Sequence, residues 1–252
     1  MLEPDRDVTI PMHELHDKVM GNPQSLTEAH NDTGSGAINL GLKSIQIWPQ
    51  NQKINSLCDP TIRSTVFTDI QEYHPRLISK ILEFEEHQRM RGRHIRGAGG
   101  ARIHHLEKWA SAEAELINAR AKVLFQHVLE SEEAVVDLCW AGVYRVGDYC
   151  MPHSHVRTVA SVVYCLDPGD EDLGDPQGGR FSFVDPRLAT CCPDQKECMT
   201  APFLPDMAAG TMIIFPSQLV HTVNPYNGVR PRITLSWNIN KTVLPPAKEH
   251  PG

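Results

Sequence analysis

The feature that most constrains the fold is the stretch 232–240, RITLSWNIN, which shows the sharpest alternation of apolar and polar residues in the chain. Successive side chains of a β-strand point to opposite faces, so this pattern predicts a strand with one apolar and one polar face. The apolar residues are Ile233, Leu235, Trp237 and Ile239, and the polar ones are Arg232, Thr234, Ser236 and Asn238. A polar face ending in arginine is costly to bury without partners. We therefore expect this face to line a pocket that holds an anion, because guanidinium binds carboxylate through two parallel hydrogen bonds.

Further strand-like segments precede this one and are separated by turn signals. Alternating or β-branched runs occupy residues 136–146, 156–166, 179–185, 211–215 and 219–223. Upstream, an alternating pattern at 45–48 predicts a first strand, Pro75 is placed to open a helix, and 106–130 has the apolar spacing of a second helix. The pattern predicts a mainly β, α+β fold, a sandwich or barrel with helices packed outside.

Composition limits the classes of protein to consider. The chain has 252 residues, of which 40% are hydrophobic and 22% charged, with a formal net charge of −7. These values are ordinary for one globular domain, and no apolar run approaches the roughly 20 residues that cross a bilayer. We expect a cytoplasmic protein with neither a membrane nor a nucleic acid as partner, because no basic stripe is present. The expected organisation is a polar arm (1–37), one domain (38–240, helical to 130 and β from 131) and a tail (241–252).

Two segments show weaker signals for binding sites. Seven cysteines without a secretion signal do not indicate a disulfide framework. Cys191, Cys192 and Cys198 share one loop but lack the C-x2-C pair typical of zinc sites, so free thiols are favoured over a metal site. The glycine-rich stretch GRHIRGAGGAR (92–102) lacks a phosphate-binding pattern, and a mobile surface loop is favoured there.

The histidines carry the clearest chemical signal. His153 and His155 are two apart, so on a strand both imidazoles would project from the same face. His221 lies on a later predicted strand, after the segment GTMIIFPSQLV, which indicates a strand and a proline-bounded turn. Neutral imidazoles suit divalent iron, zinc or copper, so we expect these three residues to hold a metal ion.

These motifs together resemble the 2-oxoglutarate/Fe(II) oxygenases and, more distantly, their prolyl-hydroxylase-like branch. The resemblance covers about residues 130–240 and only loosely the helical half. It is carried by Tyr144-Arg-Val-Gly, Pro152-His-Ser-His, Ser161-Val-Val-Tyr164, Gly179 to Arg187, Phe215-Pro-Ser, His221-Thr-Val and Arg232-Ile-Thr-Leu-Ser-Trp-Asn-Ile. It implies a double-stranded β-helix, the jelly-roll fold that is also found in cupins.

The resemblance also implies a set of functional residues. The family's metal ligands correspond to His153, His155 and His221, with His155 in a position where the family usually has an acid. Arg232 and Thr234 correspond to residues that grip the 2-oxoglutarate C5 carboxylate, and Tyr144 to a tyrosine that reaches this cosubstrate. The implied enzyme is a dioxygenase that uses Fe(II), 2-oxoglutarate and O2 to oxidise a C–H bond, releasing succinate and CO2. Halogenases of this family have a small residue where the acidic ligand usually stands. His155 fills that position here, so a halogenase is disfavoured.

Two other interpretations fit the same histidines. Gly147, His153 and His155, followed by Gly210, Pro216 and His221, match much of the two cupin motifs. A cupin-type three-histidine iron dioxygenase without 2-oxoglutarate, or a metal-binding module without turnover, therefore stays open. Arg232 and Thr234 favour 2-oxoglutarate over both.

The sequence does not identify the substrate, which we expect to be a small molecule or a peptide, and a homodimer is possible. The loops 167–178 and 186–210 are candidates for a substrate lid, with plain connection as the alternative. Arg180 and Arg187 are candidates for contact with an anionic substrate, although Arg187 is equally suited to a structural role.

Overall fold

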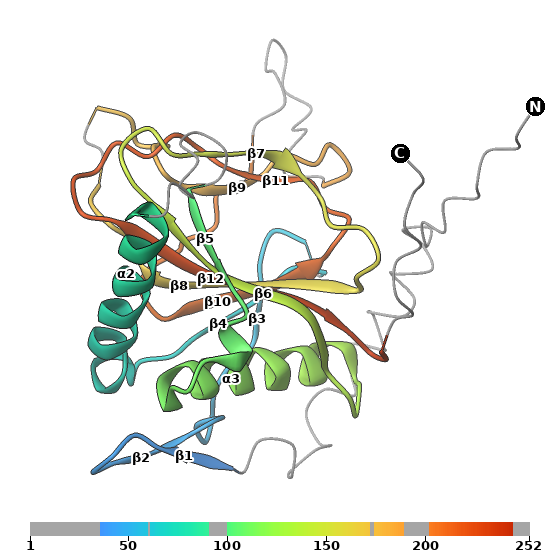
Figure 1. Cartoon of the computed structure of the whole chain (residues 1–252). Coiled ribbons are helices and arrows are strands. Elements are labelled where there is room, and N and C mark those ends of the chain that lie inside the picture. Colours follow the sequence, from blue (N-terminus) through green and yellow to red (C-terminus); the bar gives the residue numbers. More distant parts are fainter. Residues whose placement is uncertain (1–35, 60, 91–99, 172–173, 189–201, 244–252) are drawn as a thin grey trace, which may run out of the picture.

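The computed structural model describes residues 36–59, 61–90, 100–171, 174–188 and 202–243. Most of the expected arm (1–37), nearly all of the tail (241–252) and the cysteines Cys191, Cys192 and Cys198 lie outside these residues. Two antiparallel sheets face each other, and two helices lie on the outer side of the larger sheet (Figure 1).

The major sheet has seven antiparallel strands in the order β3-β4-β10-β8-β12-β6-β5. Their bounds are β3 (Asn55–Ser56), β4 (Arg63–Val66), β5 (Ala101–His104), β6 (Val135–Tyr144), β8 (Ala160–Asp167), β10 (Thr211–Pro216) and β12 (Arg232–Asn240). The strand predicted at 232–240 lies between β8 and β6. Its apolar residues belong to the core beneath the helices, and its polar residues line a pocket on the other face.

The minor sheet covers the pocket face of the major sheet. It consists of β7 (Cys150–His153), β11 (His221–Val223) and β9 (Phe181–Phe183), with β11 in the middle. Short turns carry the chain from one sheet to the other between β6 and β7 and between β10 and β11. The expected double-stranded β-helix is confirmed, although no strand ladder among the described residues closes the two sheets into a continuous barrel.

The helices are α2 (His74–Met90) and α3 (Ala112–Leu129), and a separate hairpin, β1 (Ala37–Asn39) with β2 (Ser44–Gln46), lies beyond α3 (Figure 1). Both helices bury one apolar side in the larger core, as the helical spacing predicts. Leu77 and Ile81 of α2 and Leu116, Ile117 and Leu124 of α3 are fully buried. Pro75 stands in the first turn of α2, where its missing N–H costs nothing.

The strands expected at 156–166 and 219–223 begin later, at Ala160 and His221, and two other predicted elements differ more from the structure. The helix expected at 106–130 is a short 3-10 helix (Leu106–Lys108) followed by α3, because Trp109 is extended and Ser111 caps α3 by accepting a bond from the Ala114 N–H. The loop expected at 92–102 ends in strand β5, whose residues pair with β6 from Ala101 onward. A four-residue strand has little local signal, and its pairing with a strand far along the chain supplies the missing stability.

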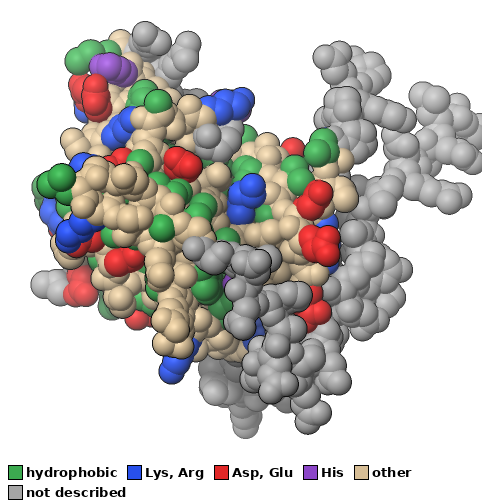
Figure 2. All heavy atoms as spheres, turned by 90° about the horizontal axis from the view of Figure 1, so that it is seen from below, with side chains coloured by type: hydrophobic (Ala, Val, Ile, Leu, Met, Phe, Trp, Pro, Cys, Tyr) green, Lys and Arg blue, Asp and Glu red, His purple; other side chains and the backbone are tan. Residues whose placement is uncertain are grey.

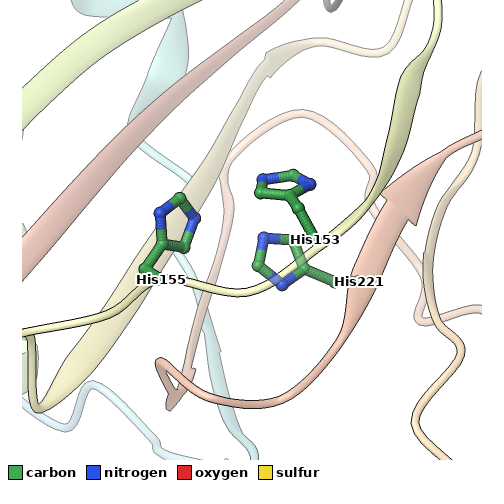
Figure 3. A group of neighbouring side chains, drawn as sticks. All are labelled: His153, His155 and His221. Carbon is green, nitrogen blue, oxygen red and sulfur yellow. The ribbon is translucent and has the colours of Figure 1, made fainter. Parts of the chain in front are cut away.

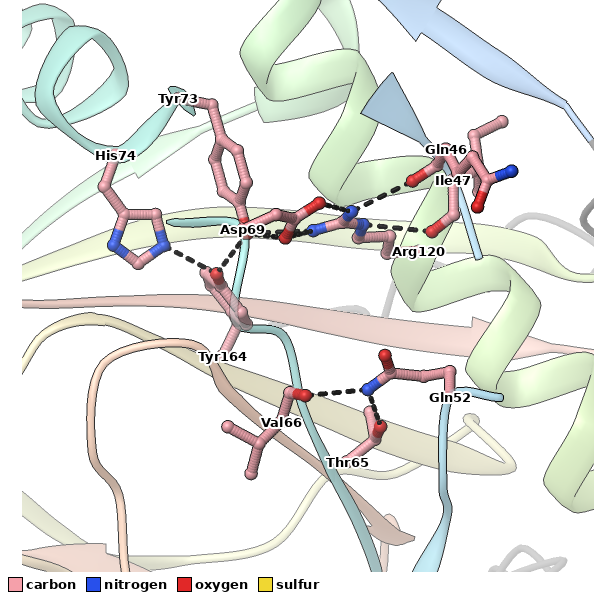
Figure 4. A network of polar contacts seen from close by, with 10 residues as sticks. All are labelled: Gln46, Ile47, Gln52, Thr65, Val66, Asp69, Tyr73, His74, Arg120 and Tyr164. Carbon is pink, nitrogen blue, oxygen red and sulfur yellow. Dashed lines mark hydrogen bonds and ion pairs between the residues drawn. The ribbon is translucent and has the colours of Figure 1, made fainter. Parts of the chain in front are cut away.

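A buried polar network ties the helices to the major sheet (Figure 4). Arg120 of α3 is fully buried and forms an ion pair with Asp69, while its Nη1 donates to the Tyr73 hydroxyl. The Tyr73 and Tyr164 hydroxyls are 3.0 Å apart, and His74 Nε2 lies 2.6 Å from the Tyr164 hydroxyl. The network links α2, α3 and β8 through buried groups that have few other hydrogen-bond partners. It therefore fixes the position of the helices on the sheet.

His74 gives this network a pH dependence. Burial lowers the pKa of His74 to about 4, well below the 6.5 of an unperturbed imidazole. Below pH 6.5 the unfolded chain therefore binds a proton that the folded chain does not, so stability falls between pH 6.5 and 4. The shift corresponds to about 3 kcal/mol for this one group. We expect His74→Gln to flatten the dependence of urea-unfolding free energy on pH across this window; an unchanged slope would mean that His74 is protonated in the folded protein.

The surface and the helices bear on possible partners. On the face seen in Figure 2, the described Lys and Arg side chains are interspersed with Asp and Glu and form no patch of one sign. Neither of the helices in the described part of the chain is long and apolar enough to span a membrane.

Candidate metal and cosubstrate site

The three predicted histidines converge at the end of the minor sheet (Figure 3). His153 ends β7 and pairs across the ladder with His221, the first residue of β11. His155 lies just beyond β7, so it is not on the predicted strand; its backbone N–H donates to the Ser217 carbonyl at 2.8 Å, which holds the turn in place. One nitrogen from each ring can be chosen so that all three lie within 4.8 Å of one another.

Hydrogen bonds fix which nitrogen two of these rings present. His153 Nδ1 lies 2.8 Å from the Met151 carbonyl, and His221 Nδ1 lies 2.9 Å from the Leu219 carbonyl. A carbonyl only accepts, so each Nδ1 carries a proton and donates it, leaving Nε2 with a free lone pair. Metal-binding histidines in proteins are oriented by this kind of bond from the other ring nitrogen.

The third ring has a side-chain partner in place of a carbonyl. His155 Nδ1 is 3.3 Å from the Asn238 amide, which in turn contacts the Ser161 hydroxyl at 3.2 Å, and Ser161 contacts Ser217 at 2.9 Å. A hydroxyl donates or accepts, so Ser161 satisfies either end of the amide. In the structure the Asn238 Nδ2 faces His155 and the Asn238 Oδ1 accepts from the Ser161 hydroxyl. Rotated by about 180°, the amide would turn its oxygen to His155, accept the Nδ1 proton and leave the His155 Nε2 lone pair free.

Burial keeps two of the imidazoles neutral. Desolvation and, secondarily, the neighbouring His153 lower the pKa of His221 to about 3 and that of His155 to about 4. The Cys150 thiol, 3.6 Å from Nδ1, raises the pKa of His153. Neutral imidazole is the form that binds a metal, so His155 and His221 need lose no proton at neutral pH.

The same pocket contains a buried cation, Arg232, that forms no ion pair with a described residue. Arg232 is 4% exposed, and its guanidinium carbon lies 5.3 Å from the centre of the Tyr144 ring. Its Nη1 has no hydrogen-bond partner among the described residues. A buried guanidinium N–H without an acceptor is costly, and an anionic ligand would supply the acceptor.

The surroundings of Arg232 are shaped for such a ligand. Thr234 lies two residues further on the same face of β12, opposite Gly142 of β6. A Cβ at Gly142 would come within 3.2 Å of the Tyr144 ring and 3.3 Å of the Thr234 hydroxyl, so glycine leaves these groups their space. Burial raises the pKa of Tyr144 to about 12, so the phenol stays protonated and can donate to an anion.

All six residues expected from the sequence line this one pocket: Tyr144, His153, His155, His221, Arg232 and Thr234. The pocket also contains residues to which sequence reasoning assigned no role, namely Arg102, Trp140, Cys150 and Asn238. Asn238 was visible on the polar face of β12, but only its contact with His155 suggests a function. Arg102 has no such signal, because the glycine-rich composition of 92–102 is typical of a loop and only pairing with β6 makes its end a strand.

Arg180 and Arg187, the two other arginines named from the sequence, have contacts outside this pocket. Arg187 forms an ion pair with the buried Asp185, which also accepts from the Val220 N–H, so Arg187 has a structural partner. Arg180 Nη2 lies 3.5 Å from the Pro205 carbonyl. Neither lines the pocket with the three histidines in the described part of the chain.

Three convergent imidazoles that could hold a metal ion therefore lie in one pocket with a buried arginine whose Nη1 has no hydrogen-bond partner among the described residues. Residues 138–238 match the family described as "Putative 2OG-Fe(II) oxygenase". The matched region contains the three histidines and Arg232, and the cofactors that the family description names, Fe(II) and 2-oxoglutarate, are those that the motifs indicated.

One solved structure shares the fold at low sequence identity, and two further matches have lower scores. AviO1 from Streptomyces viridochromogenes Tue57 is 17% identical with a TM-score of 0.52, over 75% of this chain and 93% of that one. A prolyl-4-hydroxylase from Pseudomonas putida is 17% identical, with a TM-score of 0.45 over 71% and 91% of the two chains. The viral collagen prolyl hydroxylase of Paramecium Bursaria Chlorella virus-1 is 14% identical, with a TM-score of 0.48 over 73% and 98%. No curated protein matches the sequence.

Proposed function

We propose that this chain hydroxylates an unactivated C–H bond of a small molecule or peptide, with Fe(II) on His153, His155 and His221 and 2-oxoglutarate on Arg232. The observation that carries the proposal is the buried Arg232 guanidinium, whose Nη1 has no partner among the described residues, in the pocket that the three histidines line. We also propose that residues 38–240 form the one domain that holds this site.

Each residue has a defined task in this proposal. The three histidines hold the ion through Nε2, Arg232 binds the distal carboxylate of 2-oxoglutarate, and Thr234 and Tyr144 add hydroxyl donors. The bound pair, with O2, supplies the oxidising chemistry and converts 2-oxoglutarate to succinate and CO2. The aromatic side chains of Trp140, Phe181 and Phe215 line the pocket and exclude water from it.

A cupin-type dioxygenase without 2-oxoglutarate is the second candidate, because the three ligands include no carboxylate. One anaerobic titration separates the two. With Fe(II) bound, added 2-oxoglutarate is expected to give a saturable charge-transfer absorbance, because its keto and carboxylate oxygens chelate the iron. Iron binding without any such band, together with no succinate release on exposure to O2, would favour the second candidate.

Asn238 provides a test of His155 as a ligand. We expect Asn238→Leu to weaken binding of Co(II) or Fe(II) by roughly 10–100-fold, because it removes the amide that, once rotated, would accept the His155 Nδ1 proton. Asn238→Asp should bind the metal at least as tightly as the wild type, since a carboxylate only accepts. Ser236→Ala, on the same face of the same strand, is the matched control and should have no effect. Equal metal affinity in the leucine and aspartate variants would show that Asn238 does not orient His155.

A further inference from the structure

The described residues that line the pocket include two arginines, Arg102 and Arg232, and no acidic residue. The nearby Asp148 accepts a hydrogen bond from the Arg145 N–H and is not among the lining residues. With His155 in place of an acid, the protein also supplies no negative charge to the metal. The guanidiniums of Arg102 and Arg232 and a divalent metal ion would together carry four positive charges. Bound 2-oxoglutarate, a dianion, would compensate two of them, so two positive charges would remain in the loaded pocket.

Arg102 is the cation that the proposed cosubstrate leaves without a partner. Its strand pairs Arg102 with Gly142, and Thr234 pairs with Gly142 from the other side, so the three form one row across the sheet. Its guanidinium lies 5.9 Å from the centre of the Trp140 ring, and Nη2 lies 3.7 Å from Cys150 Sγ. Cys150 in turn contacts His153, so Arg102 stands beside the metal ligands at the exposed edge of the pocket.

Six other arginines of the described chain form ion pairs with carboxylates. They are Arg76, Arg89, Arg120, Arg145, Arg187 and Arg230. Arg102 and Arg232 have no carboxylate partner among the described residues, and they are the two that line the pocket. An arginine beside an aromatic ring, with one nitrogen near a thiol and no carboxylate partner among the described residues, is well suited to bind a carboxylate or phosphate group.

We propose that the primary substrate is an anion, and that Arg102 binds its carboxylate or phosphate group while the Trp140 ring covers the adjoining apolar part. This inference rests on the proposed function. It predicts that an acid is preferred over its neutral analogue, because only the acid compensates the charge left in the loaded pocket. The preference for the acid should depend on Arg102, whereas the binding of 2-oxoglutarate should depend on Arg232.

The test uses the full chain loaded with Co(II) and 2-oxoglutarate and three probes of similar shape: 3-phenylpropionate, phenyl phosphate and 3-phenylpropionamide. Affinities are measured by calorimetry, and the cosubstrate is first verified as bound in each sample by its own titration. We expect at least one acid to bind about tenfold or more tightly than the amide. Arg102→Gln should abolish this preference, and Arg89→Gln, an exposed ion-paired arginine on α2, should retain it.

Several outcomes would overturn the inference. These are no binding by either acid, equal binding of acids and amide, or a preference that survives Arg102→Gln because the probe binds the metal directly. Loss of 2-oxoglutarate binding in Arg102→Gln would also overturn it, by assigning Arg102 to the cosubstrate. Failure of the wild-type protein to bind 2-oxoglutarate contradicts the proposed function instead, so the two failures are distinguishable.

Discussion

Replacing Arg232 by alanine is expected to weaken 2-oxoglutarate binding by at least about 30-fold, without loss of the metal. Removing one partner of a buried, hydrogen-bonded charge pair typically costs about 2–5 kcal/mol, which corresponds to roughly 30–4,000-fold in affinity. Arg232 is nearly fully buried, whereas Arg102, the other arginine among the described residues that line the pocket, is exposed. The measurement is the titration of the charge-transfer band with 2-oxoglutarate under anaerobic conditions.

Arg230→Ala is the matched control for this variant. Arg230 lies two residues earlier, is exposed, and forms an ion pair with Asp170 away from the pocket. Its removal should leave the cosubstrate affinity unchanged. If Arg232→Ala and Arg230→Ala both bound 2-oxoglutarate with wild-type affinity, Arg232 would not be the residue that binds its carboxylate.

The second large effect is expected on stability, from Arg120→Met. Arg120 is fully buried and donates to Asp69, the Tyr73 hydroxyl and the carbonyls of Gln46 and Ile47. Methionine fills much of the space but leaves these acceptors, including a partly buried carboxylate, without a donor. Breaking a buried pair in this way typically costs about 3–5 kcal/mol.

The free energy of unfolding in urea measures this cost. Arg76→Met is the control, because its ion pair with Glu113 is largely exposed on the arginine side and should contribute about 1 kcal/mol or less. A loss below about 1 kcal/mol for Arg120→Met would show that the network adapts without its arginine. Metal affinity should be retained in the folded fraction, because Arg120 lies on the opposite face of the major sheet from the histidines.

Features that follow from a local sequence pattern were predicted well, and features that depend on caps or turns were not. The strand 232–240 was predicted with its bounds and faces, because alternation is a local pattern imposed by a sheet with a core on one side and a pocket on the other. The helix at 106–130 was predicted too long, because Leu106 and Trp109 have helical spacing but belong to a separate turn. Apolar spacing alone does not show where a capping serine starts the helix.

The site was predictable where it depends on residue type and motif, and not where it depends on pairing in space. The three histidines, Arg232, Thr234 and Tyr144 were named from motifs, and the structure brings them into one pocket. The position of Arg102 in the pocket and the contact of Asn238 with His155 were not predicted, because both depend on neighbours distant in the sequence. Arg102 reaches the pocket through the pairing of β5 with β6, and Asn238 meets His155 across the space between the sheets.

The central claim is that His153, His155 and His221 together hold the iron. X-ray absorption at the iron edge of the anaerobic Fe(II) protein with 2-oxoglutarate counts the imidazoles bound to the metal. Three imidazoles are predicted for the wild type and two for His155→Ala, with the remaining positions filled by oxygen ligands. Two imidazoles in the wild type, unchanged in His155→Ala, would contradict the three-histidine site.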